Sequence, residues 1–135
     1  ILHQTSGVSS PIQHAFSQVM MSGQIVEKPK EEYRIKRNKL VDGLSQIESF
    51  ELVKPQAGLY AFPKFNRIPI EYTKAEERSN YICNLIESCK PPIFGVPGIE
   101  FGPNFSDYIR FTFSVCDIYK IEKAIDVLSD KLARK

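Results

Sequence analysis

Long apolar runs and an excess of charge of one sign are both missing from this sequence. No apolar run approaches the roughly 18 residues that a membrane-spanning helix needs. Residues 1–10 lack the basic start and apolar stretch of a secretory signal. The 18 Lys and Arg are balanced by 16 Asp and Glu, which argues against a nucleic-acid-binding face. We therefore expect a cytoplasmic protein that binds neither a membrane nor nucleic acid.

Cysteine and histidine are scarce. Cys83, Cys89 and Cys116 form no Cys-x-x-Cys pair, and no histidine stands near them. His3 and His14 are likewise unaccompanied. A metal site needs several ligands at short, regular spacings, so the sequence predicts neither a metal site nor a disulfide framework. The thiols are expected to be small buried residues of a reduced protein.

The chain is long enough for one globular domain with its own core. It has 135 residues, of which 42% are hydrophobic and 25% are charged. It contains no internal repeat and no low-complexity tract. Its first residue is Ile rather than Met, so we interpret it as an excerpt of a longer protein.

The first part of the chain has the pattern of two helices. Residues 9–11, Ser-Ser-Pro, offer a hydroxyl cap ahead of a proline, and apolar residues at helical spacing follow up to Gly23. A second helix is predicted over residues 29–47. Its dense charges have both signs, which indicates a solvated outer face rather than an anion-binding one.

Two further helices and four strands are expected in the rest of the chain. Thr73 and Glu76 predict a capping box that opens a third helix, which Pro91 stops. Apolar spacing predicts a last helix from Asp117 to Leu132. Together these elements predict a small α+β fold with helices packed on one sheet. The strands are expected at residues 50–53, 58–62, 93–96 and 108–113.

Arg110 stands out chemically, because it lies in the middle of the alternating segment 108–113. Burying a guanidinium is costly unless an anion pairs with it. An internal salt bridge to Asp107 or Glu100 would supply that anion. Alternatively, the anion arrives with a ligand, since a planar guanidinium binds a carboxylate bidentately. The glycine-containing turns over residues 97–103, where a backbone can approach a ligand closely, favour the second interpretation.

Several of these segments resemble class I/II aminotransferases, which are pyridoxal-phosphate enzymes of fold type I. Residues 95–102 and 108–114 look like the closing motif of that family. Residues 55–62, Pro-Gln-Ala-Gly-Leu-Tyr-Ala-Phe, are similar to its Pro-x-x-Gly-x-Tyr-x-Phe segment. Residues 4–6 and 9–13 resemble the stretch that leads into the last helix of its large domain. The pieces occur in the family's order and cover essentially the whole chain.

The resemblance implies that the chain is the C-terminal portion of such an enzyme. Residues 1–24 would be the tail of the large, cofactor-binding domain and would end in its last helix. Residues 25–135 would form the small C-terminal domain, an antiparallel-rich sheet with helices packed on one face. The parent enzyme would be a homodimer that moves an amino group between an amino acid and a 2-oxo acid, and its small domain would close over the substrate.

The resemblance also implies roles for single residues. Arg110 matches the arginine that holds the substrate α-carboxylate. Thr5 and Ser6 match a region that reaches toward the cofactor phosphate of the partner subunit, with a structural cap or loop as the alternative. No lysine stands in the family's Ser-x-x-Lys context, and Lys54 and Lys64 are expected to be ordinary solvated side chains. The isolated chain is therefore predicted to be inactive and not to bind pyridoxal phosphate covalently.

Other functions remain open at this point. An aminotransferase-like effector domain of a transcription regulator would bind the cofactor without turnover. A stand-alone α+β interaction module would use Arg110 only as a buried salt bridge. A pyridoxal-phosphate lyase on the same scaffold is not separated from a transaminase by these residues. Specificity for dicarboxylates would need a second cation, and residues 1–10 offer only His3.

Overall fold

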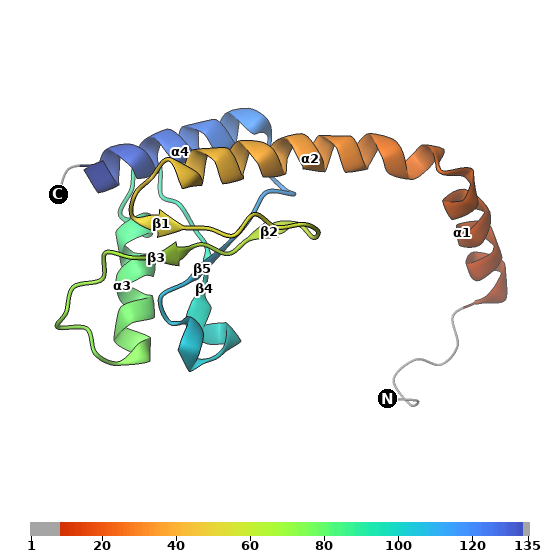
Figure 1. Cartoon of the computed structure of the whole chain (residues 1–135). Helices are drawn as coiled ribbons and strands as arrows, with labels where there is room; N and C mark the ends of the chain where they lie inside the picture. The colour runs from red at the N-terminus through yellow and green to blue at the C-terminus, as the bar shows by residue number, and fades with distance from the viewer. Residues whose placement is uncertain (1–8, 134–135) are drawn as a thin grey trace. The chain divides into compact units, whose positions relative to one another are not determined.

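The computed structural model describes residues 9–133, and Figure 1 shows their elements in chain order. These residues form four α-helices, five short strands and two 3₁₀ turns. The chain divides after Arg34 into two compact units. Among residues 9–133, no helix is both long enough and apolar enough to cross a membrane.

The first unit contains α1 (Ser10–Ser22), where the sequence predicts a helix. Gly23 ends it in a left-handed conformation, with φ of 66°, and its N–H donates to the Met20 carbonyl at 3.3 Å. The expected hydroxyl cap is wrong, because the Ser9 side chain makes no capping hydrogen bond. None of the residues of α1 is buried, and the Phe16 side chain is 64% exposed. Among the described residues of its own unit, the apolar face of α1 therefore has no partner.

The second helix, α2 (Gln24–Ser45), begins five residues earlier than predicted. Pro29 lies inside the helix instead of opening it. Proline lacks an N–H, so at this position the helix loses the hydrogen bond to the carbonyl of residue 25, close to its start. The preceding turn continues the helix despite that loss. The C-terminal half of α2, from Ile35 onward, belongs to the second unit.

The charges of α2 form pairs along its surface, as the mixture of signs predicts. Lys30 lies 3.2 Å from Glu27, and Arg34 lies 2.5 Å from Glu31, with all four side chains more than half exposed. Lys36 departs from the expected solvated face, because only 9% of it is exposed. Exposed pairs of this kind contribute little to stability, so the packing of the apolar stripe of α2 must hold the helix in place.

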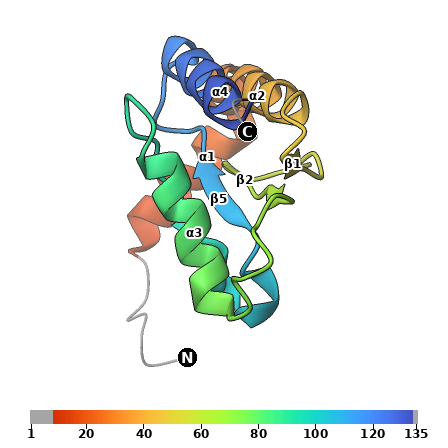
Figure 2. The ribbon, with the colours of Figure 1, turned by 90° about the vertical axis from the view of Figure 1, so that its left-hand side faces the viewer.

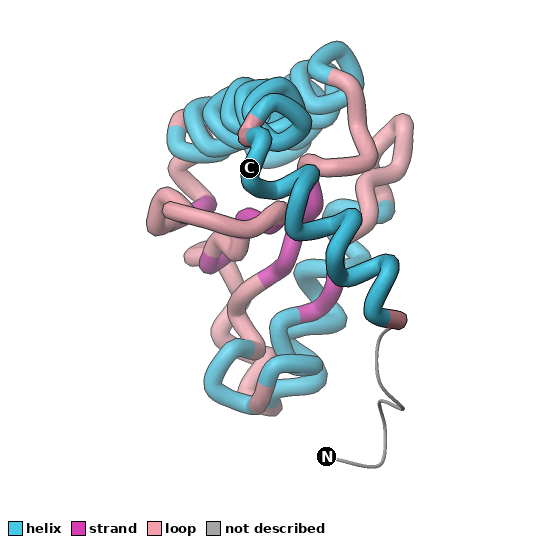
Figure 3. Tube along the Cα trace, turned by 90° about the vertical axis from the view of Figure 1, so that its right-hand side faces the viewer, coloured by secondary structure: helices cyan, strands magenta, loops and turns pink. Residues whose placement is uncertain are grey.

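The second unit contains two small antiparallel sheets. One pairs β1 (Phe50–Glu51) with β3 (Lys64–Phe65). The other has the order β2-β5-β4, with β5 (Ile109–Thr112) in the middle, β2 (Tyr60–Ala61) on one side and β4 (Val96–Pro97) on the other. All the pairings are antiparallel. Figure 3 shows how short these strands are and how much of the second unit is loop.

Each predicted strand is longer than the observed one, and β3 has no counterpart in the prediction. Val53, which the prediction places in a strand, is 88% exposed and follows the end of β1. Proline cannot donate to a ladder of hydrogen bonds, and β4 ends at Pro97. The alternation over residues 108–113 is confirmed, since Ile109, Phe111 and Phe113 are buried.

Three helices complete the core of the second unit. The C-terminal half of α2 and α4 (Ile118–Ala133) lie side by side, as Figure 2 shows, and Lys39 of α2 pairs with Glu122 of α4. The third, α3 (Ala75–Glu87), packs against β4 and β5. The buried apolar side chains come from all three helices and from the strands: Leu40, Val41, Leu44, Ile47, Phe50, Ala61, Phe65, Ile82, Ile86, Ile109, Phe111, Phe113, Ile121, Leu128 and Leu132. The α+β class predicted from the sequence is confirmed.

The start of α3 differs by one residue from the predicted capping box of Thr73 and Glu76. The residue before the helix is Lys74, whose N–H donates to the Glu77 carboxylate at 3.5 Å. A lysine side chain has no acceptor atom, so only the acidic half of a capping box can form here. The helix ends at Glu87, before Pro91, as expected.

Gly98 allows two loops to pack closely together. It begins the 3₁₀ turn η1 (Gly98–Phe101), which is followed by a second, η2 (Pro103–Phe105). The Gly98 N–H donates to the Tyr108 carbonyl at 2.8 Å. A Cβ atom at this position would overlap the carbonyl oxygens of Phe105 and Tyr108. The glycine-containing turn over residues 97–103 was expected to favour close approach of a ligand, but at Gly98 the close neighbour is the chain itself.

Replacing Gly98 by Ala should therefore destabilise the second unit strongly. Two backbone carbonyls would have to move, so we expect a loss of about 3 kcal/mol, the upper end of ordinary overpacking costs. Gly58→Ala is the comparison. Gly58 has φ of 81° and open space where the Cβ would lie, so only backbone strain of about 1 kcal/mol is expected. Urea denaturation of both variants measures the difference, and equal losses would contradict the packing role of Gly98.

Amide hydrogen exchange should differ sharply between α1 and β5. The helix has no buried residue, whereas Ile109 and Phe113, in and next to β5, are almost fully buried. Local opening should therefore cost far less free energy in α1 than in β5. Exchange monitored by mass spectrometry on a sample shown to be monomeric checks this. Equal protection of the two segments would mean that α1 is covered by some other part of the chain.

Candidate functional site

Arg110 lies in the middle of β5, the central strand of its sheet. Its cross-strand partner is Val96 of β4, and on the other side Thr112 is paired with Tyr60 of β2. Arg110 and Thr112 are two residues apart on β5, so their side chains lie on the same face of the sheet. Tyr60, which is opposite Thr112, is therefore a diagonal neighbour of Arg110 on that face. Ile109 and Phe111 point to the opposite face and are buried. The strand thus holds its core residues on one side and Arg110 on the other, as the alternation predicts.

Two aromatic rings contact the guanidinium of Arg110. Its Cζ atom lies 4.4 Å from the centre of the Tyr60 ring and 5.1 Å from the centre of the Phe101 ring. Both distances are within the range of a cation–π interaction. Tyr60 is 47% exposed and Phe101 is 43% exposed. The arginine therefore lies at a surface that a dissolved molecule can reach.

The ring of Phe101 belongs to a larger aromatic cluster, which consists of Phe62, Phe101, Phe105 and Tyr108. The Phe62 ring lies 5.3 Å from Phe101, 5.7 Å from Phe105 and 5.1 Å from Tyr108, measured between ring centres. Phe105 and Tyr108 also contact each other at 5.6 Å. These residues come from segments on both sides of β5, so the cluster joins η1 and η2 to the strand.

Within residues 9–133, Arg110 forms no ion pair. The internal salt bridge that the sequence left open is therefore not formed with either expected acid. Glu100 is exposed to solvent. Asp107, the nearer acid in the sequence, binds a different arginine.

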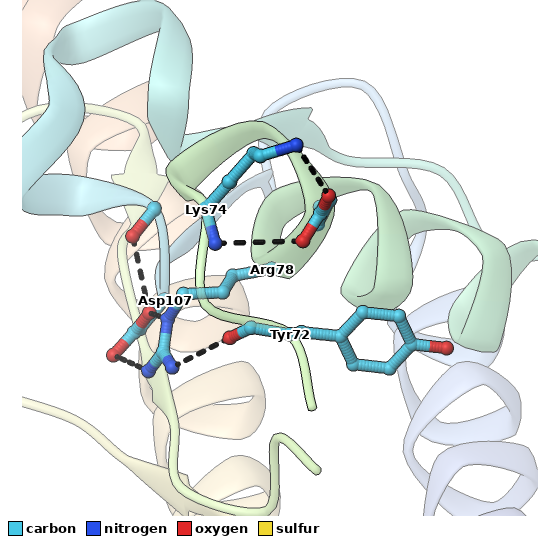
Figure 4. A network of polar contacts seen from close by, with 6 residues as sticks. Tyr72, Lys74, Arg78 and Asp107 are labelled. Carbon is cyan, nitrogen blue, oxygen red and sulfur yellow. Dashed lines mark hydrogen bonds and ion pairs between the residues drawn. The ribbon is translucent and has the colours of Figure 1, made fainter. Parts of the chain in front are cut away.

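Asp107 pairs with Arg78 of α3, as Figure 4 shows. Nε and Nη2 of Arg78 donate to the two carboxylate oxygens at 2.6 and 2.7 Å, and Nη1 donates to the Tyr72 carbonyl at 3.2 Å. The Ser106 hydroxyl donates to the same carboxylate at 3.1 Å. The hydrogen bonds from Arg78 lower the pKa of Asp107, and the same contact raises the pKa of Arg78. Arg78 was not predicted from the sequence, because no local pattern links positions 78 and 107.

Of Thr5, Ser6, Lys54 and Lys64, the structure describes only the two lysines. Thr5 and Ser6 lie outside the described residues. Lys54 is exposed, as expected for a solvated lysine, and Lys64 is half-buried in β3. Among the described residues, the side chains that contact the guanidinium are the aromatic rings of Tyr60 and Phe101. These contacts supply neither a lysine nor a phosphate-binding set for a cofactor such as pyridoxal phosphate.

The three cysteines remain free thiols in the structure. Cys89 is buried, as expected, whereas Cys83 and Cys116 are half-buried. Burial raises the pKa of the Cys83 and Cys89 thiols. In the part of the chain that is described, no group of three or more His, Cys, Asp or Glu side chains could hold a metal ion.

Comparisons with known proteins point to one kind of enzyme. No protein-family profile matches the sequence. A probable aspartate aminotransferase of Methanocaldococcus jannaschii is 31% identical over 109 residues, which is 81% of this chain and 26% of that protein. An aminotransferase from Mycobacterium tuberculosis has the same fold over 81% of this chain and 26% of its own, with a TM-score of 0.66 and 20% identity.

A third comparison agrees with these two. An aromatic aminotransferase from Pyrococcus horikoshii superimposes with a TM-score of 0.65 and 23% identity, over 84% of this chain and 28% of its own. This chain matches a C-terminal portion of an aminotransferase. It spans about a quarter of the length of the relatives that it matches. Its small α+β architecture is the one that these aminotransferases have over the matched portion.

Removal of the Asp107 carboxylate should destabilise the second unit. Asp107→Asn leaves Arg78 without its ionic partner, and we expect a loss of about 1–2 kcal/mol at pH 7, since the pair is partly exposed. The folded-state pKa of Asp107 is lowered, so its contribution is complete above the unfolded pKa of about 3.9 and is lost as the pH falls through the lower folded value.

Urea denaturation of the wild type and of Asp107→Asn at several pH values measures this contribution. The difference between the two proteins should be constant near neutral pH and should shrink below about pH 4. Glu48→Gln is the control, because Glu48 is 86% exposed in its pair with Arg67 and should contribute little. A pH-independent difference for Asp107→Asn would show that the carboxylate charge does not matter.

Proposed function

We propose that this chain is the C-terminal part of a class I/II aminotransferase of fold type I, in which Arg110 binds the α-carboxylate of both the amino acid and the 2-oxo acid. The observation that carries this proposal is the guanidinium of Arg110, which has no ion pair among residues 9–133 and lies at an accessible surface, while the neighbouring acid Asp107 is bound to Arg78. A partly enclosed arginine without an anion of its own is suited to receive one from a ligand.

The chemical value of such a contact lies in orientation as well as affinity. A guanidinium donates two parallel hydrogen bonds to the two oxygens of a carboxylate, which fixes the plane and the direction of the bound group. The α-carbon of the substrate is directly bonded to that carboxylate, so fixing one positions the other. Holding a reacting atom in a productive position accounts for a large part of many enzymatic rate enhancements.

Aminotransferases as a family depend on pyridoxal phosphate, which supplies the means to stabilise a carbanion at the substrate α-carbon. We propose that the lysine that binds the cofactor lies outside residues 1–135, because no lysine here stands in a Ser-x-x-Lys context. These residues alone would then be inactive. The proposal includes a role for Thr5 and Ser6 near the cofactor phosphate of a partner subunit in a cytoplasmic homodimer.

The domain assignment also belongs to this proposal. Residues 1–24 would form the tail of the large domain, and residues 25–135 would form the small domain that closes over the substrate. The exposed apolar face of α1 supports this assignment. A helix that packs on a larger domain has such a face, and the face is exposed when the larger domain is not included.

Two other functions would also use Arg110. An aminotransferase-like effector domain of a regulator would bind the cofactor without turnover, and a lyase would release a product without consuming a 2-oxo acid. Incubation of the full-length protein that carries this chain with amino acids, with and without 2-oxo acids, separates the three. Amino-group transfer that requires a 2-oxo acid supports the aminotransferase, and turnover without one supports the lyase.

Replacing Arg110 by Lys in the full-length protein should impair catalysis without impairing folding. Lysine keeps the charge but loses the planar pair of donors, so the carboxylate can pivot. The lost contact is worth about 1.5–3 kcal/mol, and misplacement can lower the rate by about a further 100-fold. The fall in kcat/KM should be similar for every amino donor and every 2-oxo acid, because all of them share this carboxylate.

The thermal midpoint of the same variant provides the contrast. If Arg110 served only a structural ion pair, the variant would lose stability and keep its catalytic constants. A destabilised Arg110→Lys variant with unchanged kcat/KM would therefore rule out the role of Arg110 in substrate binding.

A further inference from the structure

We propose that Tyr60 and Phe101 are positioning residues, which hold the guanidinium of Arg110 so that its N–H groups remain free for a carboxylate. The inference rests on the proposed function of Arg110. The two rings would keep the guanidinium in a fixed orientation before a ligand binds, although Arg110 has no acidic partner among the described residues.

An unpaired arginine side chain is normally mobile, because it has several rotatable bonds and a large rotamer entropy to lose. A carboxylate partner within the protein would fix it, but that carboxylate would occupy the donors that a ligand needs. An aromatic ring attracts the cation through its face. It is a much weaker acceptor than a carboxylate oxygen, so the in-plane N–H groups of the guanidinium are not occupied by strong hydrogen bonds. The rings of Tyr60 and Phe101, at 4.4 and 5.1 Å, can therefore restrain the guanidinium and leave its donors available.

The backbone fixes Tyr60 on one side of Arg110. Tyr60 belongs to β2 and is the cross-strand partner of Thr112. The preceding carbonyl, that of Leu59, accepts the Phe113 N–H at 3.2 Å and the Thr112 hydroxyl at 3.3 Å. These contacts tie the backbone at Tyr60 to the strand that carries Arg110.

Phe101 is fixed by different contacts. It ends the turn η1, where the Gly102 N–H donates to the Ile99 carbonyl at 3.0 Å. Its ring meets the Phe62 ring edge to face, with the centres 5.3 Å apart and the planes inclined by 74°. Gly98 anchors the other end of η1 to the Tyr108 carbonyl. The two rings thus reach Arg110 from independently supported segments.

The test uses variants that remove one ring at a time. In the full-length protein, Tyr60→Leu and Phe101→Leu should each lower kcat/KM by about 2- to 30-fold, which corresponds to the usual range of a cation–π contact. The decrease should be common to all amino donors and 2-oxo acids. Tyr60→Phe keeps the ring and should retain nearly the wild-type value. Phe105→Leu is the matched control, because Phe105 belongs to the same aromatic cluster and is 40% exposed but does not contact Arg110.

A second readout does not depend on activity. In ¹⁵N-labelled protein of residues 1–135, the Arg110 Nε–H resonance, assigned by its loss in Arg110→Lys, should show slow guanidinium rotation and a ring-current shift. Tyr60→Leu and Phe101→Leu should each reduce both effects, whereas Tyr60→Phe and Phe105→Leu should preserve them. Because the two variants remove different rings from the same guanidinium, a failure of one of them to fold leaves the other as the test.

The outcomes separate this inference from the function on which it rests. If Arg110→Lys leaves kcat/KM unchanged, the carboxylate-binding role of Arg110 is wrong. If Arg110→Lys lowers kcat/KM but Tyr60→Leu and Phe101→Leu behave like Phe105→Leu in both experiments, Arg110 binds the carboxylate without help from the rings. That second result would overturn the positioning role of Tyr60 and Phe101 and leave the proposed function intact.

Discussion

The pairing of β5 with a strand on each side is the constraint on which the rest of the second unit depends. Ile109 and Phe111 of this strand enter the core, while Arg110 emerges between them on the other face. Since side chains alternate along a strand, the burial of the two neighbours determines where the arginine points. A shift of one residue in register would place the guanidinium in the core and a phenylalanine at the surface. The hydrophobic core thus sets the geometry of the candidate site.

Arg78, and not Arg110, pairs with the nearest acid in the sequence, so the guanidinium of Arg110 has no acidic partner among the described residues. Arg78 reaches across from α3 and binds Asp107, the acid three residues before Arg110 in the sequence. That carboxylate accepts two hydrogen bonds from Arg78 and a third from the Ser106 hydroxyl, which together fix it in place. The same contact fastens α3 to the turn before β5. In the proposed function, this ion pair keeps Asp107 from serving as the anion for Arg110.

The parts of this architecture that sequence reasoning finds are those with a local period. The alternation of residues 108–113 and the helical spacing from Asp117 onward each repeat within a few residues, and both are confirmed. The strand β3 has two residues and no period, and it is held by distant contacts such as that of the Phe65 N–H with the Asp107 carbonyl at 2.7 Å. Nothing in a short window of sequence reveals such a contact.

The candidate site shows the same limit. The sequence identifies Arg110 and the two acids that could neutralise it, but Asp107 pairs instead with Arg78, which lies 29 positions from it. The contact with Phe101 depends likewise on a loop that returns to the sheet. The resemblance to aminotransferases rests on family motifs rather than on periodicity, and it predicted the kind of protein without these two contacts.

The close fit of Gly98 against the carbonyls of Phe105 and Tyr108 has a consequence for the evolution of this segment. The loop over residues 98–108 is closed by the hydrogen bond from the Gly98 N–H to the Tyr108 carbonyl. A loop closed in this way fits only one number of residues between its two ends. An inserted or deleted residue between positions 98 and 108 would displace the Phe101 ring relative to the strand. Surface loops usually tolerate such changes in length. This one should be an exception, and descendants of this sequence should vary the side chains here while conserving the number of residues.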